Sequence, residues 1–384
     1  MAAIGRRKTN ITDIDVLASV PDEFVGFRSV LIDCKTRRGE SPISRALWLK
    51  GLMERLRVEQ GICLLRAPRI ESDHRYTAAQ LGVTLVSEAE FPAYAAATEY
   101  PFDAPEAALI ELERWDTFFA IGKHFPRLER AIRFSRSDFW MSENEAEACS
   151  RTIVVASAIR MELDPQRPEH LAVVADLTAL FLHALARVVV RIFAAYLQPK
   201  ERGELSQALL FLLYGGRATY EKLNRIRRLV VGSQAKTEQP VPAAPSHQPT
   251  LDLLSGGADE RPMGAPDVAH SGEGAGSTTS GHLGPNLSLP EWDRFVQLVR
   301  QMLDAPLEVS RAPLLLREIA WGALSHGPGE REGVTSFARR LAEASPQGAR
   351  FAVLGLDYLY RAARLPREFG HTLTSRLLEA QTRL

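Results

Sequence analysis

The chain has 384 residues, and 47 Lys or Arg are balanced by 47 Asp or Glu, so its formal net charge is zero. This balance excludes a strong overall field that would attract nucleic acid, so any such attraction must come from local clusters of charge. A chain of this length is expected to form two or three folded units, each able to bury its own core.

Residues 1–95 alternate between strand and helix patterns. The stretches ITDIDVLASV and RSVLIDCKT are rich in Val, Ile and Leu and are joined by PDEFVGF, which predicts an antiparallel hairpin. A helix start at Ser41 and Pro42 follows, then the apolar run ICLLRA, a short helix SDHRYTAAQLG and the run VTLVS. The expected order is β-β-α-β-α-β with parallel pairing of the later strands, and AAIGRR is a further candidate for a short first strand.

The rest of the chain predicts helices and one long linker. Residues 100–232 and 289–384 carry helical spacing, whereas 233–288 are dense in Pro, Gly, Ser, Thr and Ala. Such a composition buries too little apolar surface to offset the entropy of ordering, so a disordered linker is expected there. The expected fold class is an α/β N-terminal domain with a mixed sheet, followed by an α-helical domain and a separate α-helical C-terminal module.

Residues 171–197 are apolar and long enough to span a bilayer, but they contain His183, Arg187 and Arg191 at four-residue intervals. Because a helix places these residues on one stripe, with Asp176 near the same face, a buried bundle helix is favoured over a membrane span. Pairing of the stripe with acidic residues of a neighbouring helix is favoured over a contact with nucleic acid. The N-terminal residues carry no secretory signal pattern, and the expected location is the cytoplasm.

Two acidic residues and a lysine stand at the ends of the predicted hairpin. Asp33 and Lys35 are two apart on one strand and so share a face, while Ile32 and Cys34 are expected to face the core. Antiparallel pairing would bring Asp15 near Asp33. Two carboxylates offer the hard oxygen ligands that Mg²⁺ (or Mn²⁺) takes, and such an ion polarises a phosphate and activates water, while a lysine offsets developing charge. The pattern favours phosphodiester hydrolysis over polar residues that only cap a hairpin.

These residues resemble the PD-(D/E)xK nucleases, which have the restriction-endonuclease-like fold. The resemblance is carried by Asp15 in DIDV, by the strand ending Asp33-Cys34-Lys35, and by the helix-strand-helix-strand order that follows. It implies that Asp15 and Asp33 are metal ligands, that Lys35 is the catalytic lysine, and that the substrate is DNA, in repair or defence. The family's first helix has no counterpart in the residues that precede ITDIDV.

Other charged and apolar motifs are less specific. Arg45, Lys50 and Arg55 lie on the helix after Lys35, and a solvent-exposed face is favoured for them over contact with the predicted site or with a phosphate. GRRK, KTRRG and RIRR are basic clusters that either track a nucleic-acid backbone or are simply solvated. The cluster QPTLDLL, Gln248 to Leu254, resembles the short peptides that bind the bacterial sliding clamp, and an incidental cluster is favoured over a docking peptide.

Three hypotheses therefore remain open. The first is a metal-dependent nuclease, and the second is a catalytically inactive nuclease-fold protein that binds nucleic acid or protein. The third is a helical scaffold with an incidental α/β head.

Overall fold

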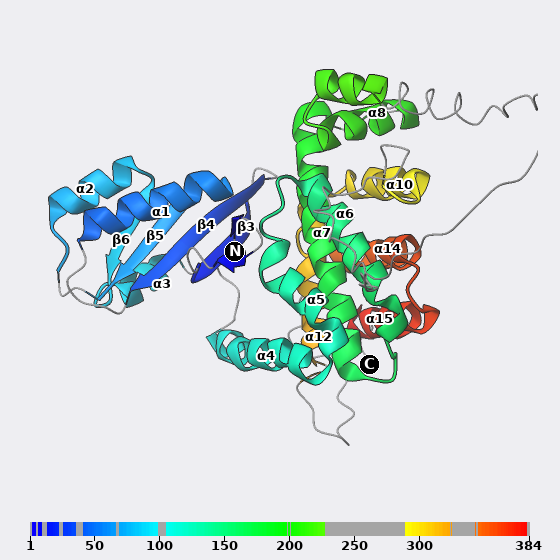
Figure 1. Ribbon diagram of the computed structural model, residues 1–384, viewed down its shortest axis with the longest axis horizontal. Helices are drawn as coiled ribbons and strands as arrows, with labels where there is room; N and C mark the ends of the chain where they lie inside the picture. The colour runs from blue at the N-terminus through cyan, green and yellow to red at the C-terminus, as the bar shows by residue number, and fades with distance from the viewer. Residues whose placement is uncertain are drawn as a thin grey trace, which may run out of the picture.

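The computed structural model describes residues 2–4, 7–9, 14–22, 26–35, 41–66, 69–98, 105–197, 199, 201–226, 289–322, 324, 342 and 345–381. It contains an α/β domain beside a larger helical bundle, and both are visible side by side in Figure 1. The predicted linker and the segment Gln248 to Leu254 lie outside the described residues.

The α/β domain has a four-stranded mixed sheet in the order β3-β4-β5-β6. Antiparallel pairing of β3 with β4 is followed by parallel pairing of β4 with β5 and of β5 with β6. The predicted element order and pairing are confirmed. The bounds are β3 Val16–Asp22, β4 Gly26–Lys35, α1 Pro42–Leu56, β5 Gln60–Leu65, α2 Ser72–Gln80, β6 Val83–Ser87 and α3 Phe91–Thr98.

Residues near the N-terminus form a separate small hairpin. Strand β1, Ala2–Ile4, pairs antiparallel with β2, Arg7–Thr9, and this pair is not part of the four-stranded sheet. Strand β3 is therefore an edge strand of the sheet that the described residues form.

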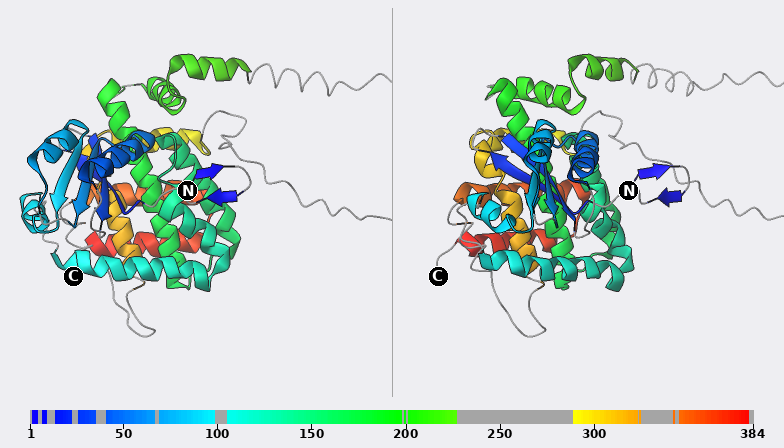
Figure 2. Two further views of the ribbon diagram at one scale, coloured as in Figure 1. Left: turned by 60° about the vertical axis from the view of Figure 1, so that its left-hand side comes forward. Right: turned by 90° about the vertical axis from the view of Figure 1, so that its left-hand side faces the viewer.

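Helices α1 and α2 cover one face of the sheet, as Figure 2 shows. Helix α1 begins where the sequence predicts, because Ser41 caps it and Pro42 occupies its first turn. Its residues Leu49 and Met53 belong to one buried apolar cluster with Leu31 of β4 and Leu85 of β6. Complete burial of a leucine contributes about 1.5–3 kcal/mol, so this layer holds the helices to the sheet.

The helical bundle is built around α7, Pro168–Tyr196. Helices α6, α12 and α14 pack along it, and α8 with the helix at 217–226 projects from one end of the bundle (Figures 1 and 2). The remaining bounds are α4 Pro105–His124, η1 Pro126–Leu128, α5 Glu129–Arg133, η2 Phe134–Asp138, α6 Glu145–Ile159, η3 Arg160–Glu162, α8 Arg202–Leu213, α10 Trp292–Met302, α11 Pro306–Val309, α12 Ala312–Gly322, α14 Pro346–Ala363 and α15 Arg367–Gln381.

Helix α7 is buried, as the sequence predicts. It is long and apolar enough to cross a membrane, yet 83% of its most apolar window is buried inside the protein. The polar stripe is also paired as predicted, because Arg187 and Arg191 contact the carboxylate of Glu145 on α6 at 3.5 and 2.7 Å.

The two predicted helical units share one hydrophobic core. Buried residues from Phe118 to Leu209 and from Leu289 to Ala380 belong to a single cluster. The prediction of a separate C-terminal module is therefore wrong. The physical reason is that α7 is apolar on nearly all sides, so the helices before residue 227 leave part of it uncovered, and α12 and α14 complete its burial.

The α/β domain contacts the bundle through the start of β4. The ring of Phe27 meets His183 of α7 edge-on at 5.5 Å between centroids, and Arg187 donates to the hydroxyl of Ser29 at 3.5 Å. Arg57, just after α1, donates to the carbonyl of Glu143 at 2.9 Å. Apolar and polar contacts thus hold the junction together.

Candidate functional site

The carboxyl ends of the parallel strands meet at one edge of the sheet. Lys35, the last residue of β4, lies opposite Leu65 of β5, which lies opposite Ser87 of β6. Strand β3 runs the other way and starts at this same edge, with Val16 opposite Ile32. Ligands of open α/β sheets bind outside the carboxyl ends of the strands, so this edge is where a site is expected.

Asp15 lies at this edge, directly before β3. Its side chain is exposed, and its Oδ2 accepts a hydrogen bond from the backbone N–H of Cys34 at 2.7 Å. The carboxylate of Asp15 is thus held against the backbone of the Asp33-Cys34-Lys35 segment. Antiparallel pairing brings these two parts of the chain together, as the sequence analysis expected.

Asp33 faces the helices that cover the sheet. Its side chain is 3% exposed and lies on the same face of β4 as buried Leu31, whereas Cys34 is exposed. The prediction that Ile32 and Cys34 face the core and Asp33 faces outward is therefore wrong. Both faces of β4 carry apolar residues, and the strand alone does not indicate which face α1 and α2 will cover.

Arg45 of α1 binds the carboxylate of Asp33 with two hydrogen bonds. Its Nε donates to Oδ2 and its Nη2 donates to Oδ1, both at 2.6 Å. The guanidinium also lies over the ring of Trp48, 3.5 Å from the ring centroid. A bidentate arginine-carboxylate pair of this kind is among the stronger polar interactions in proteins, and stacking on an indole adds to it.

The sequence analysis missed this role of Arg45. It favoured a solvent-exposed face for Arg45, Lys50 and Arg55 over contact with the site, which fits Arg55 and the partly exposed Lys50 but not Arg45, whose side chain is 15% exposed. The available signal was a carboxylate on a buried strand, which needs a charged partner, followed by an arginine in the first turn of the next helix.

The donor groups at this edge do not fit a divalent cation as they are arranged. Both oxygens of Asp33 accept hydrogen bonds from the Arg45 guanidinium, whose positive charge repels a cation. One oxygen of Asp15 is bonded to the Cys34 amide. Among the residues that the structure describes, no group of three His, Cys, Asp or Glu side chains could hold a metal ion. Mg²⁺ prefers six oxygen ligands in octahedral geometry, which this arrangement does not offer.

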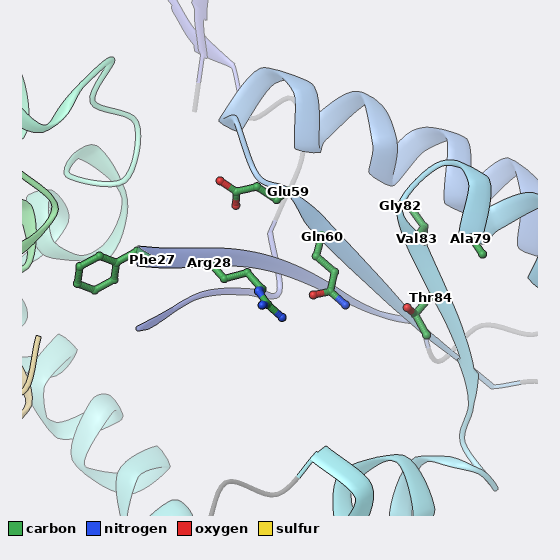
Figure 3. A pocket seen from close by; sticks show the side chains of 8 residues that line it. All are labelled: Phe27, Arg28, Glu59, Gln60, Ala79, Gly82, Val83 and Thr84. Carbon is green, nitrogen blue, oxygen red and sulfur yellow. The ribbon is translucent and has the colours of Figure 1, made fainter. Parts of the chain in front are cut away.

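A pocket of about 510 Å³ lies at the opposite edge of the sheet, at the amino ends of the parallel strands (Figure 3). Glu59 at its rim accepts a hydrogen bond from the backbone N–H of Ser29 at 2.9 Å, and Arg28 is exposed there. The pocket is therefore distinct from the edge that carries Asp15 and Asp33. Its lining residues are Phe27, Arg28, Glu59, Gln60, Ala79, Gly82, Val83 and Thr84.

Comparison of the chain with protein-family models, with curated proteins and with solved structures finds no match.

Proposed function

We propose that this chain is a nuclease-like protein that binds nucleic acid, with DNA as the first candidate, and that its α/β domain in the described conformation does not cleave it. The observation that favours binding over cleavage is the pair of hydrogen bonds from Arg45 to both oxygens of Asp33. A carboxylate held in this way is not free to coordinate an ion.

Exposed cations at the same edge support nucleic-acid binding. Arg66 follows β5 directly and is exposed, and Arg69 is exposed close behind it. Arg66 makes a contact of 3.7 Å with Glu88, and both side chains are largely exposed, so the pair contributes little and a phosphate could replace the carboxylate. Arginine is well suited to phosphate because its planar group donates two parallel hydrogen bonds.

Hydrolysis is the second candidate, and the position of Asp15 favours it. Asp15 lies next to the strand that carries Asp33 and Lys35, and a metal-dependent site built from these three residues would need that closeness. Cleavage with Mg²⁺ or Mn²⁺ would first require Arg45 to release Asp33. The proposal also includes a cytoplasmic location and a protein partner for the helical bundle.

Parallel binding and cleavage assays test the proposal. We expect the chain to bind a fluorescein-labelled 30-base-pair DNA duplex and to leave plasmid and single-stranded DNA intact in MgCl₂ or MnCl₂. Lys35→Ala with Arg66→Ala should weaken binding about tenfold. The matched control Arg55→Met, an exposed residue of α1, should bind like the parent chain.

The outcomes separate the two candidates. If the parent chain cleaves DNA and Asp33→Asn does not, the function is hydrolysis and not binding alone. Cleavage that appears only in Arg45→Met would show that the ion pair restrains a competent site. A chain that neither binds nor cleaves DNA contradicts both.

A further inference from the structure

The segment from the end of α4 through η2 exposes a dense row of cations. It buries Leu128, Ala131, Ile132 and Phe134 in the bundle core and turns its other side to solvent. The exposed positions between 123 and 136 are Lys123, His124, Pro126, Arg127, Glu129, Arg130, Arg133 and Arg136. Five of them are Lys or Arg and one is Glu, in a chain whose net charge is zero. We call Lys123, Arg127, Arg130, Arg133 and Arg136 the basic ridge.

Internal pairing leaves most of this charge available. Arg127 contacts Glu162 at 2.6 Å, but its side chain is 77% exposed, and Arg133 lies 3.5 Å from Asp138. Within the part of the chain that the structure describes, Lys123 and Arg130 form no ion pair. Exposed ion pairs contribute about 0–1 kcal/mol, so a polyanion can displace the carboxylates.

We infer that the basic ridge binds the phosphate backbone of a nucleic acid, an inference that rests on the proposed function and extends it to the helical bundle. Four of its five cations are arginines, which bind phosphate through two parallel hydrogen bonds. No large apolar side chain is exposed between 123 and 136, which disfavours insertion into a lipid surface. Contacts to the phosphate backbone of a nucleic acid supply affinity but do not distinguish one base sequence from another.

The ridge ends where the α/β domain meets the bundle. Phe139, directly after η2, lies 6.2 Å from the ring of His183, and Phe27 of β4 lies 5.5 Å from the same ring. In Figure 1 α5 lies between α7 and the α/β domain. A nucleic acid on the ridge would therefore pass close to the start of β4, where Arg28 is exposed.

Charge reversal in the full-length chain tests the inference. The variant Lys123→Glu with Arg130→Glu is compared with a matched control, Arg350→Glu with Arg367→Glu, which reverses two exposed arginines on α14 and α15. Fluorescence anisotropy with a labelled 30-base-pair duplex is measured from 50 to 200 mM NaCl. The ridge variant should bind at least tenfold more weakly, and the slope of log affinity against log salt should fall by about two, because two phosphate contacts are lost.

Three results would overturn the inference. The first is a ridge variant whose affinity for the duplex and salt slope are unchanged, and the second is a control variant that loses as much affinity as the ridge variant. The third is displacement of the duplex by polyglutamate at the same charge concentration as DNA, which would indicate an acidic protein partner. Unaltered circular dichroism and melting temperature show that each variant is folded.

The same assay separates this inference from the proposed function of the α/β edge. If the ridge variant loses binding while the variant Lys35→Ala with Arg66→Ala binds like the parent chain, the basic ridge binds the nucleic acid and the α/β edge does not. If only the variant Lys35→Ala with Arg66→Ala loses binding, the α/β edge binds the nucleic acid and the inference about the basic ridge is wrong.

Discussion

At the scale of single residues, the buried Asp33 carboxylate depends on Arg45. A charged group that loses its partner inside a protein is costly, whereas an apolar replacement of both partners is tolerated far better. Arg45→Met removes two charge-assisted hydrogen bonds from a side chain that is 3% exposed. This residue therefore links the stability of the α/β domain to the chemistry available at its edge.

We expect Arg45→Met to lower the free energy of unfolding by about 3 kcal/mol, measured by urea denaturation. The double variant Asp33→Leu with Arg45→Met should recover part of that loss, because the buried charge is gone. The control Arg55→Met, exposed on the same helix, should change stability by less than about 0.5 kcal/mol. A loss in Arg45→Met no larger than in the control would contradict a structural role for the pair.

His183 makes stability depend on pH. Burial among Phe27, Phe139 and Trp140, and then the nearby charges of Arg187 and Arg317, lower its pKa to about 3. The unfolded chain has a histidine pKa of about 6.5, so it binds a proton below that pH while the folded chain does not. The contribution is fully present above about pH 6.5 and is lost progressively as the pH falls toward 3.

Between pH 7 and pH 5 the parent chain should lose about 2 kcal/mol more unfolding free energy than His183→Gln. Urea denaturation of both chains at several pH values measures this difference, and comparison with the variant removes the contribution of carboxylates. Parallel pH profiles for the two chains would show that His183 is protonated in the folded state.

At the scale of elements, α14 approaches α7 closely because it has a glycine at the contact. A Cβ at Gly355 would overlap the side chain of Leu182, with the Leu182 Cγ only 2.8 Å away. Leu182 is fully buried, so its side chain has little room to move. The glycine thus lets two helices from distant parts of the sequence pack against each other.

Gly355→Ala should destabilise the bundle by about 1–3 kcal/mol, because overpacking shifts side chains from their preferred rotamers. Gly203→Ala in α8 is the matched control, since nothing lies within 4 Å of its Cβ position. It should leave stability unchanged or raise it slightly, because alanine is the better helix former. Equal thermal unfolding of the two variants would refute the close packing.

At the scale of the whole molecule, the bundle depends on helices from both sides of residues 227–288. Helix α12 lies along α7, and α14 contacts both. Residues 1–232 and 289–384 produced as two chains should therefore copurify and elute together in gel filtration, because the shared core drives their association.

Substitutions on α12 test the specificity of this association. Leu316 is fully buried, whereas Leu314 is 46% exposed on the same helix. Leu316→Asp should abolish copurification, since it places a charge in the core, and Leu314→Asp should retain it. Two fragments that elute separately without any substitution would show that the bundle does not depend on the shared core.

The sequence by itself determined the order of elements, the start of α1 at Ser41 and Pro42, and the burial and polar pairing of α7. These features depend on local signals, namely apolar periodicity, capping residues and charge spacing, which the chain carries within a few turns. The closeness of Asp15 to the Asp33-Cys34-Lys35 strand was also predictable, because a short hairpin leaves little choice of pairing.

Only the tertiary structure decided which face of β4 is buried, that Arg45 binds Asp33, and that the helices on both sides of 227–288 form one core. Each of these depends on which helices cover a given surface. The pattern of a strand with apolar residues on both faces, or of a helix that is apolar on all sides, does not specify which helices from elsewhere in the sequence will pack against it. The packing of α1 on β4 also determines whether Asp33 can hold a cation. The sequence position of Asp33 is compatible with a metal ligand, but in the fold Arg45 of the covering helix binds its carboxylate.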